Sequence, residues 1–242
     1  MQKAWRTVVA VAMALSALLM GVRVWSAGPA GPPPAAAPYA GLLAGRTVVI
    51  DPGHGGWDPG AMTRRAREAD INLAIAEMLR RLLVGTGARV LLTWSRARPI
   101  PTHRKYRVQA RSQWINRQHA DLLVDIHTNV GSGGVGPQVF YWDGLPSRLL
   151  ADAIQEELSG FTRTHRRVTR IDQYVLRHSL IPAVNVEVGF LSHAQEGARL
   201  TALQYQRDLA WCIFVGVLRW FVGGAMPPES LPPPNPAELL QR

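Results

Sequence analysis

The chain has 242 residues, of which 47% are hydrophobic and 18% charged, and its formal net charge is +10. This length suits one sizeable domain with appendages, and the composition excludes a chain that is disordered throughout. Cys212 is the only cysteine, which excludes an internal disulfide and a cysteine-based metal site. It lies in an apolar helical pattern, so we expect it to be a small core residue.

The positive charge belongs to the main part of the chain. Residues 1–40 hold three basic residues and no acid, which leaves a charge of about +7 for the rest. Such a balance indicates an anionic partner, namely nucleic acid, an anionic membrane surface or an anionic wall polymer. A basic surface that is only solvated explains the same charge equally well.

The N-terminal segment has the layout of an export signal or a signal anchor. Lys3 and Arg6 precede an uncharged run from Thr7 to Val22. The run is longer than most signal h-regions and slightly short of a standard membrane span. We therefore assign residues 1–27 to a signal peptide or membrane anchor and leave both forms open. Either form sends the following domain across the membrane, to an extracytoplasmic place at the cell envelope.

The rest of the chain divides into a linker, a domain and a tail. Residues 28–41 are a Pro/Ala/Gly-rich linker, and residues 225–242 are a proline-rich tail that we expect to be flexible. Between them, residues 42–224 alternate strand and helix patterns. Expected strands cover 48–50, 88–94, 121–126, 137–142, 168–176 and 183–188, and expected helices cover 68–84, 104–119, 147–158 and 195–221. This alternation predicts a single α/β domain, with a mostly parallel sheet and helices on both faces.

Two expected strands end in a histidine. After the β-branched run 48–50, the residues Asp51-Pro52-Gly53-His54-Gly55-Gly56 cannot continue a strand, because proline lacks the N–H donor and glycine permits other backbone angles. His127 ends the third strand in the same way. Ligands in α/β proteins bind at such carboxyl ends. Taken alone, a histidine in such a turn is more often a surface residue without a function, so His54 has to be judged with its neighbours.

The two histidines can converge on a metal ion, since neighbouring strands lie about 5 Å apart. A catalytic zinc site takes three protein ligands and an open position for water. Glu68 stands at the start of the helix after the His54 loop and supplies the third ligand. Asp70 is the competing candidate. A carboxylate at a helix N-terminus is also stabilised by the helix dipole without any metal.

A fourth candidate is Glu187, which interrupts the apolar run 183–188. An unpaired buried carboxylate is costly, so Glu187 needs a partner, either water activated by the metal or an arginine in an internal salt bridge. Two imidazoles, one carboxylate ligand and a spare carboxylate are sufficient for metal-assisted amide hydrolysis. The metal activates water, and the spare carboxylate moves the proton to the leaving amine.

Other patterns carry less chemistry. Residues 131–136 satisfy G-x-G-x-x-G, but a strand follows them rather than a helix, so we expect a flexible loop over the site and no dinucleotide. Ser132 and Ser192 lack the setting of a hydrolase nucleophile, although Ser192 and Gln195 resemble a helix capping box. We expect the remaining histidines to be surface residues, and among them His178 and His193 are the candidates to border the pocket.

Four motifs together resemble a known family. VVIDPGHGG, READINLAIA, DIHTN and YVLRHSLIPAVNVEVGFLSH are similar, over about residues 46–221, to the zinc-dependent N-acetylmuramoyl-L-alanine amidases, and most to the spore-cortex, germination-specific CwlD type. The resemblance implies a twisted six-stranded sheet and cleavage of the amide between the muramic lactyl group and L-alanine of the stem peptide. It assigns His54, Glu68 and His127 as Zn²⁺ ligands, and Glu187 as the catalytic acid and base.

The resemblance also implies partners and a place in the cell. Peptidoglycan (a glycan strand with its stem peptide) is the expected substrate. A partner cell-wall enzyme is a further candidate partner, and the N-terminal segment would contact the membrane. No nucleic acid is expected as a partner. The expected location is the cell envelope, with the forespore as one candidate. The expected role is cortex maturation to muramic δ-lactam or wall remodelling. Asn129 and Arg177 are candidate substrate contacts.

The chain departs from the family pattern in places that leave these four residues intact. Ala69 replaces a usual lysine, His193 a usual asparagine, and Thr128 and Val130 flank Asn129 in place of leucine and alanine. Two other functions remain open: a non-catalytic wall-binding module and a zinc peptidase that cuts within the stem peptide.

Overall fold

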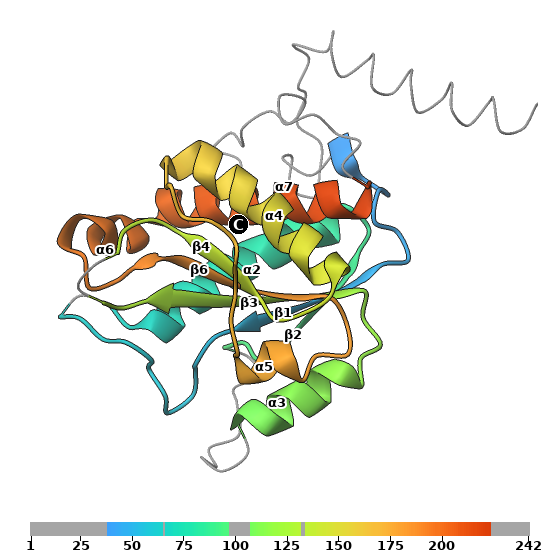
Figure 1. Cartoon of the computed structure of the whole chain (residues 1–242), viewed down its shortest axis with the longest axis horizontal. Helices are drawn as coiled ribbons and strands as arrows, with labels where there is room; N and C mark the ends of the chain where they lie inside the picture. Colours follow the sequence, from blue (N-terminus) through green and yellow to red (C-terminus); the bar gives the residue numbers. More distant parts are fainter. Residues whose placement is uncertain (1–37, 65, 97–106, 132–133, 224–242) are drawn as a thin grey trace, which may run out of the picture.

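The computed structural model describes residues 38–64, 66–96, 107–131 and 134–223, which form an α/β domain (Figure 1). Its six-stranded sheet has the order β2-β1-β3-β6-β4-β5. The strands are β1 (Thr47–Pro52), β2 (Arg89–Leu92), β3 (Leu122–Asn129), β4 (Gln138–Tyr141), β5 (Thr169–Arg170) and β6 (Ala183–Phe190). Only the β4–β6 pair is antiparallel among these neighbours. The expected fold class is confirmed.

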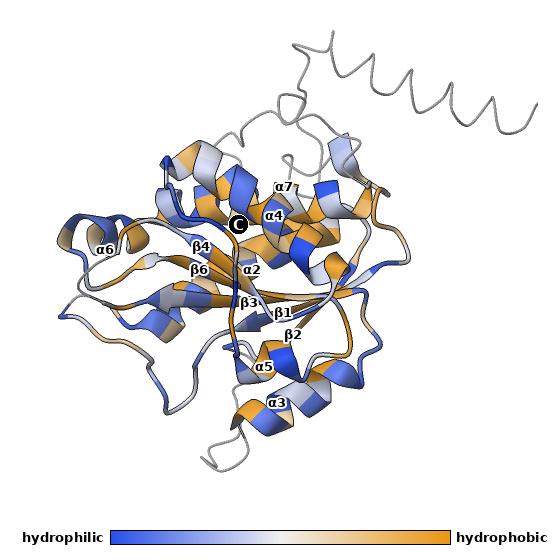
Figure 2. Ribbon diagram, in the orientation of Figure 1, coloured by the Kyte–Doolittle hydropathy of each residue, from blue (hydrophilic) through white to orange (hydrophobic). Residues whose placement is uncertain are grey.

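Helices cover both faces of the sheet. On one face lie α2 (Glu68–Gly85), α4 (Leu145–Thr162) and α7 (Leu203–Phe221), and on the other lie α3 (Arg107–Asn116) and α5 (Tyr174–Arg177). The short α6 (Ala194–Leu200) follows β6. Hydrophobic residues gather along the strands and on the helix sides that meet them (Figure 2). Because side chains alternate along a strand, Leu122 and Val124 join the core under α2 while Leu123 joins the smaller core under α3 and α5.

The position of α2 determines where the site forms. Its apolar residues Ile71, Ile75, Leu79 and Leu82 recur at helical spacing and are all buried. This face packs the helix against β1 and β3. Its first residue, Glu68, is therefore held near the carboxyl ends of those two strands. The expected helix 68–84 is confirmed almost to the residue.

Two expected elements near the C-terminal half differ in the structure. The strand expected at 168–176 is a strand only at Thr169–Arg170 and becomes the helical turn α5. Val175 and Leu176 pack with Ile115 in the smaller core, and this tertiary contact overrides their strand propensity. The helix expected at 195–221 is two helices, α6 and α7, separated at 201–202.

The expected capping box of Ser192 and Gln195 is wrong. The helix cap is His193, whose Nδ1 accepts a hydrogen bond from the backbone N–H of Glu196 at 3.3 Å. The Ser192 hydroxyl instead bonds the backbone of Gly131, accepting from its N–H at 3.0 Å and donating to its carbonyl at 2.9 Å. These bonds tie the start of α6 to the loop after β3.

The packed chain begins earlier than the expected boundary at residue 42. The ring of Tyr39 is buried, with its centroid 6.2 Å from that of Trp211 and 5.7 Å from that of Phe214 on α7. Cys212, on the same helix, is buried as expected. The expected signal or anchor, the tail and Ser132 lie outside the described residues. Among the helices that are described, none is long and apolar enough to cross a membrane.

Candidate active site

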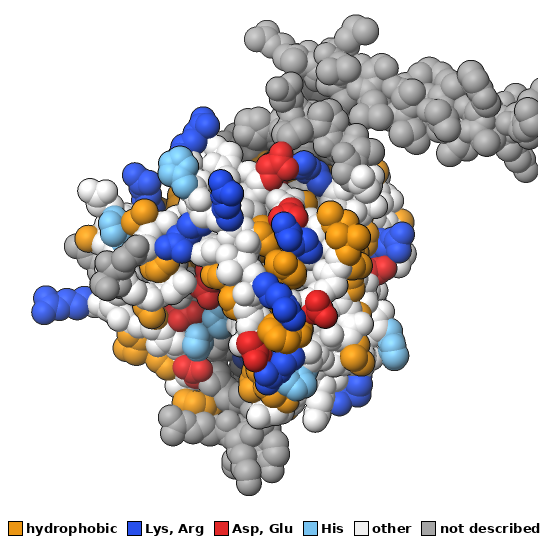
Figure 3. Space-filling model, in the orientation of Figure 1, with side chains coloured by type: hydrophobic (Ala, Val, Ile, Leu, Met, Phe, Trp, Pro, Cys, Tyr) orange, Lys and Arg blue, Asp and Glu red, His pale blue; other side chains and the backbone are white. Residues whose placement is uncertain are grey.

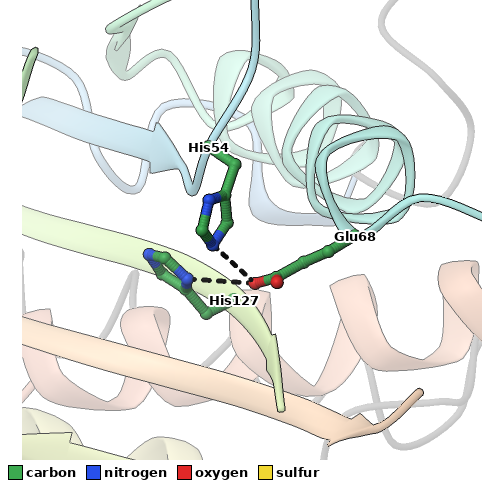
Figure 4. A group of neighbouring side chains, drawn as sticks. All are labelled: His54, Glu68 and His127. Atoms are coloured by element: carbon green, nitrogen blue, oxygen red, sulfur yellow. Dashed lines mark hydrogen bonds and ion pairs between the residues drawn. The ribbon is translucent and has the colours of Figure 1, made fainter. Parts of the chain in front are cut away.

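The structure brings His54, Glu68 and His127 together at the carboxyl ends of β1 and β3 (Figure 4). Glu68 Oε1 lies 3.2 Å from His54 Nε2 and 3.1 Å from His127 Nδ1. The potential ligand atoms of the three residues all lie within 4.8 Å of one another. The sequence separates these residues by up to 73 positions, and the parallel register of β1 and β3 closes that gap.

Glycines leave the room that these side chains occupy. A Cβ atom on Gly53 would stand 2.4 Å from the His127 ring, and one on Gly60 would stand 2.6 Å from Glu68 Oε2. Real Cβ contacts are not this short, so a side chain at either position would displace a member of the cluster. His54 itself adopts a left-handed backbone with φ of 62°, a conformation uncommon for residues other than glycine.

Backbone amides fix the carboxylate of Glu68. Its Oε2 accepts from the N–H of Ala61 at 2.9 Å, and its Oε1 accepts from the N–H of Thr128 at 3.1 Å. Burial raises the pKa of Glu68, but hydrogen bonds from His127, His54 and Ala61 outweigh burial and hold that pKa far below its usual range. Glu68 is therefore ionised at any physiological pH.

The two imidazoles respond to the same carboxylate. Burial lowers the pKa of His54, while its hydrogen bonds with Glu68 and Asp58 raise it above the usual range. Burial likewise lowers the pKa of His127, while the charge of Asp125 and interactions with the Asp125 and Glu68 carboxylates raise it well above that range. In this arrangement a strongly anionic pocket holds both rings, which is the environment that a bound cation also requires.

Asp70, the competing ligand candidate, lies outside the cluster. Its carboxylate accepts from the Arg67 guanidinium at 2.8 and 3.0 Å on the exposed side of the first turn of α2. The choice of Glu68 over Asp70 therefore follows from which side of the helix each residue occupies.

Glu187 lies on β6 in register with His127 on β3, so both side chains emerge on the same face of the sheet. Its Oε2 is buried and has no hydrogen-bond partner among the described residues. Burial raises the pKa of Glu187 to about 7, and the charges of Glu68 and Asp125 contribute in the same direction. Within the described parts of the chain, no arginine forms an ion pair with Glu187, so the salt-bridge alternative finds no support.

The donor set fits a zinc ion. Two imidazoles and one carboxylate form one of the ligand sets of catalytic zinc, with ligand distances of about 2.0–2.2 Å. Tetrahedral ligands at that distance stand roughly 3.3 Å from one another, close to the 3.2 and 3.1 Å between Glu68 and the two histidines. A protonatable glutamate stands beside the set.

The other expected site residues lie farther out. Asn129 is at the end of β3, two residues past His127, where its Oδ1 accepts from the N–H of Val130. Arg177 is not in the cluster. It pairs with Asp172 at 2.7 Å and lines a hollow beside Pro182, just ahead of the amino end of β6, whereas Glu187 lies toward the carboxyl end.

Sequence reasoning missed three acids around the site. Asp58 contacts His54, Asp125 contacts His127, and Asp51 pairs with Arg111. Asp125 interrupts an apolar strand run as Glu187 does, and Asp51 directly follows one, so a signal like that of Glu187 was also present for them. Asp58 carries only the signal of lying four residues from His54.

The site and the fold define a class: an α/β protein with a candidate metallohydrolase centre at the carboxyl edge of a mostly parallel sheet. Comparison with known proteins gives the family. The Amidase_3 family model, described as N-acetylmuramoyl-L-alanine amidase, matches residues 48–219. This chain belongs to the N-acetylmuramoyl-L-alanine amidase family and is an amidase of that kind.

Similar proteins agree with this membership. The germination-specific N-acetylmuramoyl-L-alanine amidase of Bacillus subtilis is 30% identical over 207 residues, which cover 79% of this chain and 86% of that protein. The amidase LytC of the same organism is 30% identical over 185 residues, which cover 74% of this chain and 36% of that protein. The structure of the CwlD amidase from Clostridioides difficile, solved in complex with the GerS lipoprotein, superposes with a TM-score of 0.67 at 34% identity and covers 74% of this chain and 99% of that one.

Proposed function

We propose that this amidase uses a zinc ion held by His54, Glu68 and His127 to hydrolyse the amide between the lactyl group of N-acetylmuramic acid and L-alanine of the stem peptide. The observation that carries the proposal is the convergence of Glu68 Oε1 on both histidines, at 3.2 and 3.1 Å, with Glu187 in register beside His127. A zinc ion bound there would lower the pKa of a water molecule and polarise the amide carbonyl.

Glu187 moves the proton in this reaction. Its unpartnered Oε2 accepts a proton from the attacking water and then donates it to the nitrogen of the departing L-alanine. The pKa of about 7 suits both halves of this transfer, because the group exchanges a proton readily near neutrality. The apolar residues on either side of Glu187, Val186 and Val188, are fully buried and keep water from the strand behind it.

Substrate recognition extends beyond the cluster. Asn129 lies at the end of β3, two residues past His127, where its side-chain amide can bond the peptide or the sugar. Arg177, on α5, lines the hollow beside Pro182. The amino end of β6 at that hollow lies four residues, or roughly 13 Å, from Glu187, so only an extended substrate would span both. Arginine side chains scattered over the face drawn in Figure 3 add positive charge that favours an anionic wall polymer.

The cellular role follows by analogy with the similar proteins. Their names refer to germination and to a complex with a lipoprotein, so we propose that this amidase acts on the spore cortex, outside the cytoplasmic membrane and with a partner protein. Action on the vegetative wall is the second candidate, because LytC is also similar.

One digestion experiment tests the proposed reaction. Purified peptidoglycan is incubated with the full chain, with and without zinc, and the new ends are identified by mass spectrometry. The proposal predicts free L-alanine amino termini and muramic acid without peptide, only when zinc is present. New ends within the stem peptide would indicate a peptidase, and binding without zinc-dependent cleavage would indicate a wall-binding module.

A further inference from the structure

A second row of polar residues lies directly beneath the candidate active site. Asp51 on β1, Asp125 on β3 and Asn185 on β6 are in register with one another, two residues before the row that holds His127 and Glu187. The side chains of both rows point to the same face of the sheet, because strands have a period of two. All three lower residues are at most 1% exposed. Burying a carboxylate without a partner costs free energy, so the two aspartates of this row need an interaction that offsets that cost.

The geometry of the imidazoles supplies that interaction for Asp125. His54 has Nε2 at 3.2 Å from Glu68 Oε1, and its other nitrogen, Nδ1, at 2.9 Å from Asp58 Oδ2. In His127 the two nitrogens have the opposite roles. Nδ1 is 3.1 Å from Glu68 Oε1, and Nε2 is 3.4 Å from Asp125 Oδ1. Each ring therefore presents one nitrogen to the shared ligand position and the opposite nitrogen to its own carboxylate.

We propose that Asp58 and Asp125 are positioning residues, each of which accepts the N–H of one ligand histidine and so fixes its tautomer and orientation. His54 then binds the metal through Nε2 and His127 through Nδ1. A carboxylate that accepts the N–H of a metal-binding histidine orients the ring and makes the ligating nitrogen more basic. This inference rests on the proposed zinc site.

Both carboxylates are themselves held in place. Asp58 Oδ1 accepts from the N–H of Gly60 at 3.0 Å, so the loop that follows β1 orients it. Asp125 Oδ2 accepts a hydrogen bond from Nε2 of Gln173, the residue directly before α5, at 3.3 Å. The second oxygen of each aspartate lies against its histidine. Asp58 Oδ2 is within hydrogen-bond distance of His54, whereas Asp125 Oδ1 lies at ion-pair distance from His127 and has no hydrogen-bond partner among the described residues.

Arg111 allows two carboxylates to stand side by side. Its Nη1 lies 3.1 Å from Asp51 Oδ1, and the hydroxyl of Thr93 donates a hydrogen bond to the same carboxylate. The guanidinium offsets the charge of Asp51, so Asp125 does not face an unpaired like charge in the next strand. Arg111 also donates through Nη2 to the carbonyl of His54 at 2.8 Å, which ties α3 to the left-handed backbone of the first ligand.

The test measures zinc affinity on the full chain by competition with a chromogenic chelator at one fixed pH. Asp58→Asn and Asp125→Asn should each weaken zinc binding by about 10–100-fold. Asp70→Asn is the matched control, because Asp70 is a neighbouring acid that bonds Arg67 at the surface. The zinc affinity of this variant should equal that of the wild type. Wild-type affinity in both Asp58→Asn and Asp125→Asn would overturn the inference, whereas failure of the wild type to bind zinc would overturn the proposed function.

A second measurement uses the wild-type protein and therefore does not depend on whether a variant folds. ¹⁵N–¹H correlation spectra of histidine in the zinc-loaded full chain report which ring nitrogen carries the proton. The inference predicts a protonated Nδ1 in His54 and a protonated Nε2 in His127. The reverse assignment in either ring would contradict it.

Discussion

The carboxyl of Glu187 links the chemistry of the site to the stability of the fold. Burial raises its pKa to about 7 in the folded chain, whereas an unfolded chain ionises it near 4.5. Between those pH values the unfolded state binds fewer protons, so the free energy of unfolding falls as pH rises. A shift of this size corresponds to about 3 kcal/mol at most.

Glu187→Gln removes this linkage and gives a direct prediction. In the metal-free protein, the variant should gain stability relative to the wild type as pH rises from about 4.5 to about 7, and the difference should then level off. Urea unfolding at several pH values measures it. A stability difference that is the same at pH 4 and pH 8 would show that the carboxyl is not buried as described.

Substrate contacts are separable from catalysis at the residue scale. Asn129→Ala should raise KM for a muramoyl-peptide fragment several-fold and leave kcat nearly unchanged, because a contact made equally in the ground and transition states affects binding only. The same assay on Arg177→Ala, with a longer glycan-peptide fragment, decides whether the substrate reaches that residue. An unchanged KM in either variant would remove that residue from the recognition surface.

Residue patterns predicted the cluster because each member carries a local signal. His54 follows β1, His127 lies near the carboxyl end of β3, Glu68 begins α2, and Glu187 interrupts an apolar run. What no local signal carries is the identity of the nitrogen that each imidazole presents. That choice depends on Asp58 and Asp125, whose contacts arise only when the loop and strands are assembled.

At the element scale, the close approach of α7 and α4 holds the core on the α2 side of the sheet. A Cβ atom at Gly216 would stand 2.6 Å from the backbone of Ile154. Gly216→Ala should therefore force the helices apart and reduce the free energy of unfolding by about 1–3 kcal/mol. Thermal unfolding of the metal-free protein measures the change.

Gly160 provides the matched control on α4. It is an exposed helical glycine, and a Cβ atom there would meet nothing within 4 Å. Gly160→Ala should stabilise the protein by about 0.5–1 kcal/mol, because alanine loses less conformational freedom than glycine on forming a helix. Equal effects of the two substitutions would contradict the described packing of α4 and α7.

Elements that bury a continuous apolar stripe were predictable, and elements decided by tertiary contact were not. The spacing of Ile71, Ile75 and Leu79 specifies α2 without reference to the rest of the chain. The helical turn at α5 depends on the smaller core beneath it, and the α6–α7 break lies within an expected continuous helix. Neither difference changes the position of His54, Glu68 or His127, so the predicted cluster is intact.

At the scale of the whole molecule, the order β2-β1-β3-β6 places the two histidine strands beside each other and the glutamate strand next to them. Alternating strand and helix patterns predicted a mostly parallel sheet, but they do not specify strand order. The order comes from the structure. It is the reason that four residues spread over 134 positions act at one place.

The central claim is that one zinc ion, three ligands and Glu187 perform the amide hydrolysis together. The most direct measurement compares zinc content per chain with the rate at which new L-alanine amino termini appear in peptidoglycan. We predict that Glu187→Gln retains zinc and loses turnover by at least about 100-fold, whereas His127→Ala loses both zinc and turnover. Wild-type turnover in Glu187→Gln would contradict the account.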